Sequence, residues 1–400
     1  PMPRKFRFPE SQKDTTGNDL PFAARGLPPE EITLAEELRQ SGYRTLHIGK
    51  WHLGRDPLLR PVAQGFDESL MMEGGLYLPV DSPDVANARN EFAVLDKVQW
   101  EIMSYAVSFN NSDRFEPDSY LTDYFTDEAV KAIAANKGQP FFLYLAHWGI
   151  HTPLQATRQD FEAVGDNFLN HRTRVYAGMI RAVDRSVGRV VQALKDNGID
   201  DNTLIIFTSD NGGANYIGMP DINKPYRGWK LSFFEGGTHV PFVMRWPNRL
   251  KGGTTYPHAI SHLDIMPTAL GAASLSPQAE LIDGVNLLPH LSGQITARPH
   301  DSLIWREGHY QAILSDGWKM QRSASPEMVR LFNLAQDPFE KSDLSAARGD
   351  KVAELSRLLD AHNNRQADPM WPSNVEIPIW IDKSLADQPT LDDEFIYWPN

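Results

Sequence analysis

Basic and imidazole side chains follow an apolar segment near the start of this 400-residue chain. In the stretch GYRTLHIGKWHLG, residues 42–54, Lys50 and His52 come directly after an apolar strand and lie between two glycines. Lysine is a compact positive charge that suits an anionic oxygen group, and histidine can hold or transfer a proton. The pattern indicates an anion site, although a solvated basic loop would have the same composition.

Three further polar clusters occur beside apolar segments. They are His147 with His151 after FFLYLA, Asp210 with Asn211 after LIIFTS, and the loop RGWKLSFFEGGTHVP with Arg227, Lys230, Glu235 and His239. Each has a structural alternative: DNGG has the composition of a turn, and a single histidine in a loop can be satisfied by backbone groups. Convergence of several clusters on one sheet edge would favour function.

The chemistry of these residue types is specific. Asp210 and Asn211 offer hard oxygen donors, which suit Ca²⁺ or Mg²⁺ rather than zinc, and two ligands are too few for calcium. Lys50 and Lys230 suit the oxygens of an anion, while a histidine can serve the leaving oxygen. Together these groups predict cleavage of an ester of a tetrahedral oxyanion.

Helical and strand-like segments alternate and must position these residues. TLAEELRQSG predicts a helix with a capping box from Thr33 to Glu36 and Gly42 at its end, followed by a strand at 44–48. Long helical patterns at 122–138 and 171–198 precede the apolar strands FFLYLA and LIIFTS. The order predicts an α/β fold with a mostly parallel central sheet of buried strands flanked by helices. Ligands of such sheets bind beyond the carboxyl ends of the strands.

The pattern changes near residue 296. Short strands separated by turns predict a small antiparallel subdomain, followed by a helix near 351–365 and a tail rich in Pro and Trp. We therefore expect a catalytic domain at 1–295, an antiparallel β subdomain at 296–345, and a helix with a tail at 346–400.

Composition limits the partners. A formal net charge of −13 argues against nucleic acid. No cysteine is present, which excludes disulfides and thiolate sites in these residues. No apolar run is long enough to span a membrane. The chain starts at Pro1 without a signal-like segment, and we expect that a natural N-terminal segment is missing.

Several motifs resemble those of the type I sulfatases, the formylglycine-dependent arylsulfatase family of the alkaline-phosphatase-like superfamily. They are GYRTLHIGKWHLG, YLAHWGIHTPLQ, FTSDNGG, RGWKLSFFEGGTHVPFVMRWP and SHLDIMPTALGAA, in the order of that family. DGWKM and RLFNLAQDPFEKSDL resemble its small terminal subdomain. The resemblance extends from about Gly26 to Leu344.

The resemblance implies hydrolysis of sulfate esters at a calcium site, with Mg²⁺ less suited. It implies that Asp210 and Asn211 bind calcium, and that Lys50 and Lys230 bind the sulfate group. His52 would contact the formylglycine, and His151 would contact the sulfate and assist the leaving alcohol. His239 receives no role, because relatives often have arginine or another polar residue there.

One part of the family pattern is absent. The nucleophile arises from Cys/Ser-x-Pro-x-Arg after a pair of calcium-binding aspartates, and neither motif occurs in these residues. We expect both in the missing segment, so this chain alone should be inactive. Two alternatives stay open: a phosphonate or phosphate ester hydrolase of the same superfamily, and a non-catalytic binding protein with the sulfatase fold.

The substrate is expected to be a sulfated small molecule or glycan. Trp51, Trp148 and Trp229 could stack on a sugar or pack internally. Because many relatives are exported and degrade glycans, we expect a periplasmic or extracellular location. The sequence does not indicate the oligomeric state.

Overall fold

The computed structural model describes residues 26–90, 92–168, 170–277, 282–366 and 376–399. Its contacts divide the chain into two compact units. We call the described residues of 26–205 and 244–297 the sheet unit, and those of 206–243 and 298–399 the C-terminal unit.

The sheet unit is built on a four-stranded sheet of order β4-β2-β1-β5. The strands are β1 Arg44–Gly49, β2 Glu68–Met72, β4 Val107–Phe109 and β5 Phe141–Ala146. The central strand β1 pairs in parallel with both β2 and β5, and β4 pairs antiparallel with β2. The prediction of an α/β fold with a mostly parallel central sheet is therefore confirmed.

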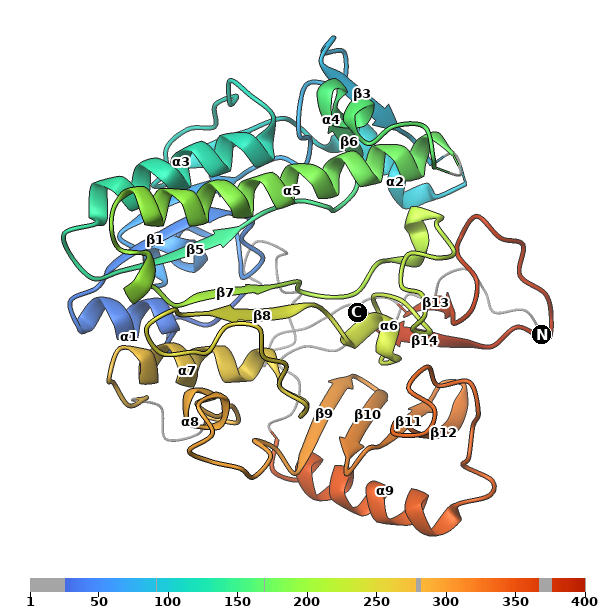
Figure 1. Cartoon of the computed structure of the whole chain (residues 1–400). Coiled ribbons are helices and arrows are strands. Elements are labelled where there is room, and N and C mark those ends of the chain that lie inside the picture. The colour runs from blue at the N-terminus through green and yellow to red at the C-terminus, as the bar shows by residue number, and fades with distance from the viewer. Residues whose placement is uncertain (1–25, 91, 169, 278–281, 367–375, 400) are drawn as a thin grey trace, which may run out of the picture. The chain divides into compact units, whose positions relative to one another are not determined.

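Helices lie against this sheet (Figure 1). They include α1 Leu34–Gln40, α3 Leu121–Asn136 and α5 His171–Asp196. Both α1 and α3 contact β1, and α5 packs along α3. The capping box predicted for α1 is present: Glu36 N donates to Thr33 Oγ1 at 3.1 Å, and Thr33 N donates to Glu36 Oε2 at 2.7 Å.

Two predicted strands differ from expectation in their burial. The apolar runs predicted fully buried strands, yet Tyr144 of β5 is 45% exposed, and Phe207 of β7 (Ile205–Thr208) is 39% exposed. The sheet order explains this result within the described residues. There β5 is the last strand of its sheet, and β7 pairs only with β8 (Phe242–Arg245).

Smaller elements complete the sheet unit. They are β3 Val85–Ala88, α2 Val94–Ile102, β6 Leu154–Thr157, α4 Arg158–Ala163, α7 Ile265–Ala272 and α8 Leu288–Leu291. Short 3-10 helices include Pro57–Leu59 and Pro61–Ala63 in the loop after β1. Strands β3 and β6 pair antiparallel, and helix α5 packs on both.

The C-terminal unit contains the antiparallel sheet that the sequence predicts. Its order is β12-β11-β10-β9, formed by β9 Ser302–Glu307, β10 Tyr310–Ser315, β11 Trp318–Ala324 and β12 Glu327–Asn333. Helix α9 (Gly349–Asn363) buries Leu355 and Leu359 against Ile313, Met320 and Leu331 of that sheet.

A second, smaller sheet pairs β13 (Glu376–Trp380) with β14 (Phe395–Pro399). The sequence did not predict these strands. Residues 367–375 of the predicted tail lie outside the described residues. The domain bounds 1–295, 296–345 and 346–400 stay a prediction.

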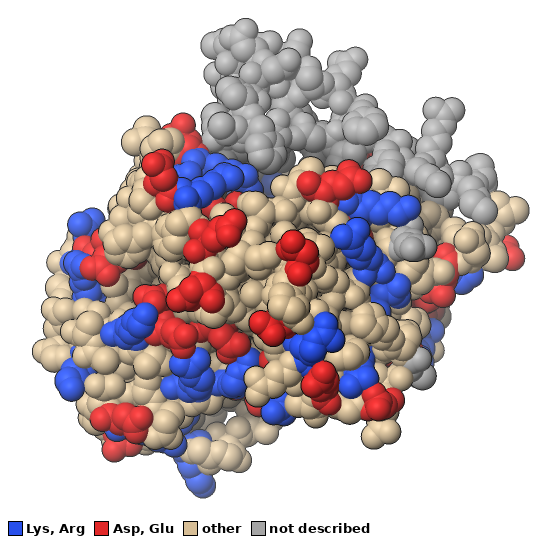
Figure 2. All heavy atoms as spheres, turned by 90° about the horizontal axis from the view of Figure 1, so that it is seen from above, with Lys and Arg blue, Asp and Glu red and all other residues tan. Residues whose placement is uncertain are grey.

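Within the described residues, no helix has the length and apolar character required to cross a membrane. Figure 2 shows acidic and basic side chains intermingled on the face in view.

Candidate active site

Lys50 begins the loop after β1, and the backbone there requires glycine. Gly49 has φ +120°, and a Cβ at this position would lie 2.0 Å from Ala146 O of the neighbouring strand β5. The close approach lets Lys50 N donate to Ala146 O at 2.7 Å. Lys50 therefore follows β1 at the carboxyl edge of the sheet.

His47, inside β1, holds the carbonyl of Lys50. Its Nε2 lies 3.1 Å from Lys50 O, which can only accept, so Nε2 carries the proton; Nδ1 then accepts from Ser69 Oγ at 2.9 Å. Burial lowers the pKa of His47 to about 4, with the Lys50 hydrogen bond opposing the shift. His47 is thus a neutral support for the Lys50 loop.

Trp148 brings Lys50 and His151 together. Lys50 Nζ lies 5.5 Å from the centre of the Trp148 ring, and the His151 ring stacks on Trp148 with a centroid distance of 3.9 Å. The indole is buried, and its Nε1 donates to Gly75 O at 2.9 Å. One fixed aromatic ring therefore contacts a cation and an imidazole that the sequence predicts for one site.

A buried tyrosine hydrogen-bonds the turn that carries His151. Tyr77 is fully buried, and its hydroxyl lies 2.9 Å from both Trp148 O and His151 O. His151 Nδ1 donates to Thr152 O at 2.7 Å. With its proton fixed on Nδ1, the imidazole has Nε2 as the nitrogen that can accept a second proton.

The other two histidines of these loops differ from His151. His147 is buried toward α5, where its Nε2 lies 2.7 Å from Ser186 Oγ, and burial lowers its pKa to about 4. His147 therefore has a structural role in the core and does not face a substrate. His52 is exposed in the loop beyond Lys50.

In the C-terminal unit, the DNGG turn and the Lys230 loop are joined through backbone. Gly212 N donates to Gly237 O at 3.0 Å, and Lys230 N donates to Gly213 O at 2.9 Å. A Cβ on Gly212 would lie 1.8 Å from Gly236 O, so the two segments meet at glycine. Asp210 and Asn211 thus lie on a turn that is hydrogen-bonded to Lys230.

Leu231, the next residue after Lys230, has φ +76°. The left-handed region is a genuine outlier for a bulky residue, and such strain is concentrated at functional sites.

A buried charge cluster supports the same loop. Lys319 of β11 is fully buried, with Nζ 2.7 Å from Glu235 Oε1 and 3.3 Å from Glu340 Oε1. Burial alone would raise the pKa of Glu235, but Lys319 and His239 lower it to about 2. Glu340 Oε2 also accepts from Glu235 N at 2.6 Å. Lys319 therefore joins the antiparallel sheet to the segment that follows Lys230.

The remaining residues of that loop are structural. Arg227 pairs with Asp382 and Glu394 of the C-terminal strand region. Trp229 is buried, and its Nε1 donates to Trp380 O at 3.0 Å. His239 pairs with Glu235 at 2.8 Å. In the sheet unit, Trp51 donates to Leu59 O at 2.8 Å.

Asp210 and Asn211 have suitable chemistry for a metal ion, but two residues do not complete a coordination sphere. Asp210 is exposed, and the Asn211 amide nitrogen donates to Gly212 O at 2.8 Å, which leaves the amide oxygen as the possible ligand. Carboxylate and amide oxygens fit a hard cation. No group of three or more His, Cys, Asp or Glu residues that could hold a metal occurs within the described part of the chain.

The structure therefore presents two partial sites. Lys50 and His151 meet on Trp148, and the Asp210–Asn211 turn is bonded to Lys230. That all six predicted residues form one site stays a prediction. Sequence reasoning missed His47, Tyr77 and Lys319. A histidine inside an otherwise apolar strand was a usable signal for His47; Tyr77 and Lys319 depend on distant partners.

Comparisons with known proteins show that this α/β chain belongs to the alkaline-phosphatase-like superfamily of enzymes. The sulfatase family model matches residues 7–275. N-acetylgalactosamine-6-sulfatase of Canis lupus familiaris is 34% identical over 369 residues, 83% of this chain and 68% of that protein. The chain belongs to the sulfatase family and is a sulfuric ester hydrolase.

A further relative and a solved structure agree. The uncharacterized sulfatase YdeN of Escherichia coli (strain K12) is 31% identical over 304 residues, 71% of this chain and 51% of that protein. The crystal structure of Ps i-CgsB in complex with k-i-k-neocarrahexaose is 33% identical, with a TM-score of 0.72, and the match covers 86% of this chain and 76% of that one.

Proposed function

We propose that this protein hydrolyses sulfate esters of carbohydrates, using Lys50, His52, His151 and Lys230 with a calcium ion at Asp210 and Asn211. The observation that carries the proposal is the contact of both Lys50 and His151 with Trp148, at 5.5 Å and 3.9 Å between the groups. An ammonium group and an imidazole held by one rigid ring can bind a sulfate group and serve its leaving oxygen together.

The proposed roles follow from the chemistry of each side chain. Lys50 and Lys230 bind the sulfuryl oxygens and offset their charge as it redistributes. His151 carries its second proton on Nε2 and donates it to the leaving oxygen as the sulfur–oxygen bond breaks, which releases the alcohol. The sulfuryl group would pass to the nucleophile of the complete protein, and water would then release it as sulfate. Trp148 and Tyr77 keep this imidazole oriented.

The proposal also includes a calcium ion and a formylglycine nucleophile. Asp210 and Asn211 would hold the calcium together with further oxygen ligands, and the flexible coordination of Ca²⁺ suits such a loop better than the strict octahedron of Mg²⁺. A bound calcium ion would supply positive charge for the sulfuryl oxygens. His52 would contact the formylglycine, a nucleophile for which residues 1–400 contain no Cys/Ser-x-Pro-x-Arg motif.

Relatives support a sulfated glycan as substrate. One relative is named N-acetylgalactosamine-6-sulfatase, and Ps i-CgsB was solved with a neocarrahexaose. We propose a sulfated saccharide for this chain too, and a periplasmic or extracellular location, where such polymers occur.

Replacement of Lys230 tests the proposal. In the complete protein, Lys230→Ala should lower sulfatase turnover by about 10²–10³-fold, as the removal of one electrostatic donor typically does. Lys224→Ala is the matched control, because Lys224 is an exposed lysine of the same unit that pairs with Asp221. Unchanged turnover in Lys230→Ala would remove this residue from the site.

The ratio of activities on matched sulfate, phosphate and phosphonate esters separates the proposed function from its nearest alternative. A preference for sulfate is expected. A preference for the phosphonate would identify a phosphonate hydrolase instead.

A further inference from the structure

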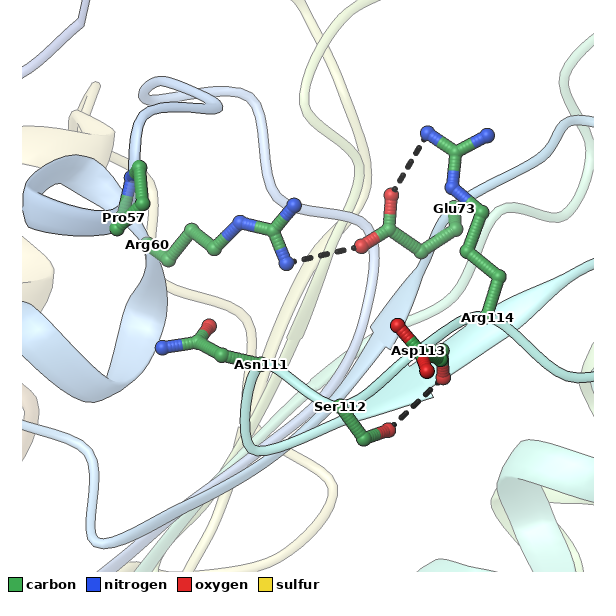
Figure 3. Close-up of a pocket in the computed structure, with 7 residues that line it drawn as sticks. All are labelled: Pro57, Arg60, Glu73, Asn111, Ser112, Asp113 and Arg114. Carbon is green, nitrogen blue, oxygen red and sulfur yellow. Dashed lines mark hydrogen bonds and ion pairs between the residues drawn. The ribbon is translucent and has the colours of Figure 1, made fainter.

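Two polar clusters outside the predicted site differ in what their side chains bind. In the hollow of the sheet unit shown in Figure 3, the Glu73 carboxylate lies 3.1 Å from Arg60 Nη1 and 3.3 Å from Arg114 Nη2. With Asp113 on the same rim, the charges that line this hollow sum to zero, so it lacks the positive charge of an anion site. Asn223 of the C-terminal unit instead binds the backbone of two loops that carry predicted site residues.

The Asn223 amide joins the DNGG turn to the loop of Lys230. Its Oδ1 accepts from Gly213 N at 2.8 Å, and its Nδ2 donates to Gly213 O at 2.9 Å and to Gly228 O at 3.0 Å. A primary amide has two N–H donors, so both are used on these two carbonyl groups. One side chain therefore ties the end of the DNGG turn to the residue two positions before Lys230.

The carbonyl of Gly213 is shared between Asn223 and Lys230. It accepts from Asn223 Nδ2 and from Lys230 N, each at 2.9 Å. The approach of the amide requires glycine, because a Cβ on Gly213 would lie 2.9 Å from both Asn223 Oδ1 and Ile222 Cδ1. Ile222 packs against the hydrophobic cluster that contains the buried Trp229. Asn223 is therefore carried by a segment that is anchored in the core of its unit.

The turn at Lys230 is closed by a second side chain. Ser232 N donates to Trp229 O at 3.0 Å, Ser232 Oγ donates to the same carbonyl at 2.8 Å, and Trp229 N donates to Ser232 Oγ at 3.1 Å. Lys230 and Leu231 are the two central residues of this turn, and Leu231 is the residue with φ +76°. Ser232 thus fixes the turn itself, and Asn223 fixes the turn against the DNGG segment.

We propose that Asn223 is a positioning residue of the sulfatase reaction, which holds the Lys230 ammonium at a fixed place relative to the Asp210–Asn211 turn. The inference rests on the proposed function, in which this ammonium group and a calcium ion on that turn act on the same sulfuryl group. Two positive groups stabilise one transferring group only when both are preorganised around its oxygens. A displacement of about 1 Å can cost about 10²-fold in rate.

The test combines substitutions of Asn223 and Lys230 in the complete protein. Asn223→Asp is nearly isosteric and keeps an acceptor for Gly213 N, but it cannot donate to either carbonyl. Asn223→Ala removes the amide without adding a charge. The control is Asn333→Asp in the same unit, because Asn333 Oδ1 accepts from the nearby Ala335 N at 3.1 Å. Turnover of an aryl sulfate and of N-acetylgalactosamine 6-sulfate is measured at saturating calcium, and urea denaturation gives the folded fraction.

Asn223→Asp and Asn223→Ala should each lower turnover about 10–100-fold, the usual cost of removing a group that orients a site residue. In the Lys230→Ala background the same substitutions should cost less than about threefold, because the group that they misplace is already absent. Asn333→Asp should retain wild-type turnover. Equal losses in both backgrounds, or no loss in the wild-type background, overturn the inference.

Calcium binding separates the inference from the proposed function. Calorimetric titration should show about 10–100-fold weaker calcium binding in Asn223→Asp. Lys230→Ala should bind calcium at least as tightly as wild type, because it removes a nearby cation and no oxygen ligand. Weaker calcium binding in Asn223→Asp without release of sulfate by wild type would overturn the proposed hydrolysis and leave the role of Asn223 standing. Release of sulfate at a rate that does not depend on Asn223 would do the reverse.

Discussion

The two lysines predicted to bind one sulfate are supported by different physical interactions. The Lys50 loop and the His151 turn rest on neutral groups: an indole, a phenol and an uncharged imidazole, His47. The Lys230 loop is followed by Glu235, which is held by the buried ammonium of Lys319 beside Glu340. Neutral supports tolerate the loss of one partner far better than buried charges do, so the two regions should respond differently to substitution.

Removal of the buried ammonium is expected to have the largest effect. Lys319→Met removes the ammonium shared by two buried carboxylates and leaves Glu235 with His239 alone, which should reduce the free energy of unfolding by about 3–5 kcal/mol. Urea denaturation measures this change. Adding Glu235→Gln and Glu340→Gln should restore part of the loss, because the uncompensated charges are then removed. A loss below about 1 kcal/mol in Lys319→Met, the scale of a surface pair, would show that the cluster is not ionic.

Removal of the phenolic hydroxyl in the neutral region should have a smaller effect. Tyr77→Phe leaves Trp148 O and His151 O without their shared donor, at a cost of about 1–3 kcal/mol. Turnover should fall as well, because the His151 turn loses its support. Tyr120→Phe is the control: Tyr120 is buried, stacks on Tyr77 and donates to Gln155 O at 2.8 Å. Equal losses of turnover in both variants would contradict a specific role for Tyr77.

The last prediction concerns pH, and its effect is smallest near neutral pH. Burial lowers the pKa of both His47 and His147 from 6.5 to about 4. The unfolded chain therefore binds protons before the folded chain does, and the stability present above pH 6.5 is lost as pH falls toward 4. Each histidine adds up to about 1.4 kcal/mol per pH unit in that window. His147→Gln should reduce the slope of unfolding free energy against pH by this amount, and an unchanged slope would show that the pKa of His147 is the same in the folded and unfolded chains.

Local patterns predicted the elements well where one segment carries the whole signal. The Thr33–Glu36 capping box, the apolar strand before Lys50 and the antiparallel strands after residue 296 depend on near neighbours. The burial of β5 and β7 could not be predicted from their composition, because it depends on the neighbours of each strand in the sheet.

The candidate site shows the same limit. Residue types and spacing singled out Lys50, His151 and Lys230, but not the groups that hold them. In sequence, Lys319 in DGWKM has the appearance of a surface lysine; it is buried because Glu235, 84 residues earlier, is its partner. Tyr77 likewise meets His151 from 74 residues away. Such pairings arise from the topology and leave no local pattern.

The left-handed backbone at Leu231 has a practical consequence for engineering. Glycine or asparagine would adopt φ +76° more easily, and relief of such a conformation is a common route to higher melting temperature. A screen that selects only for heat tolerance should therefore replace Leu231 early. If the backbone at Leu231 orients the ammonium group of Lys230, the variants with higher melting temperature would have lower turnover.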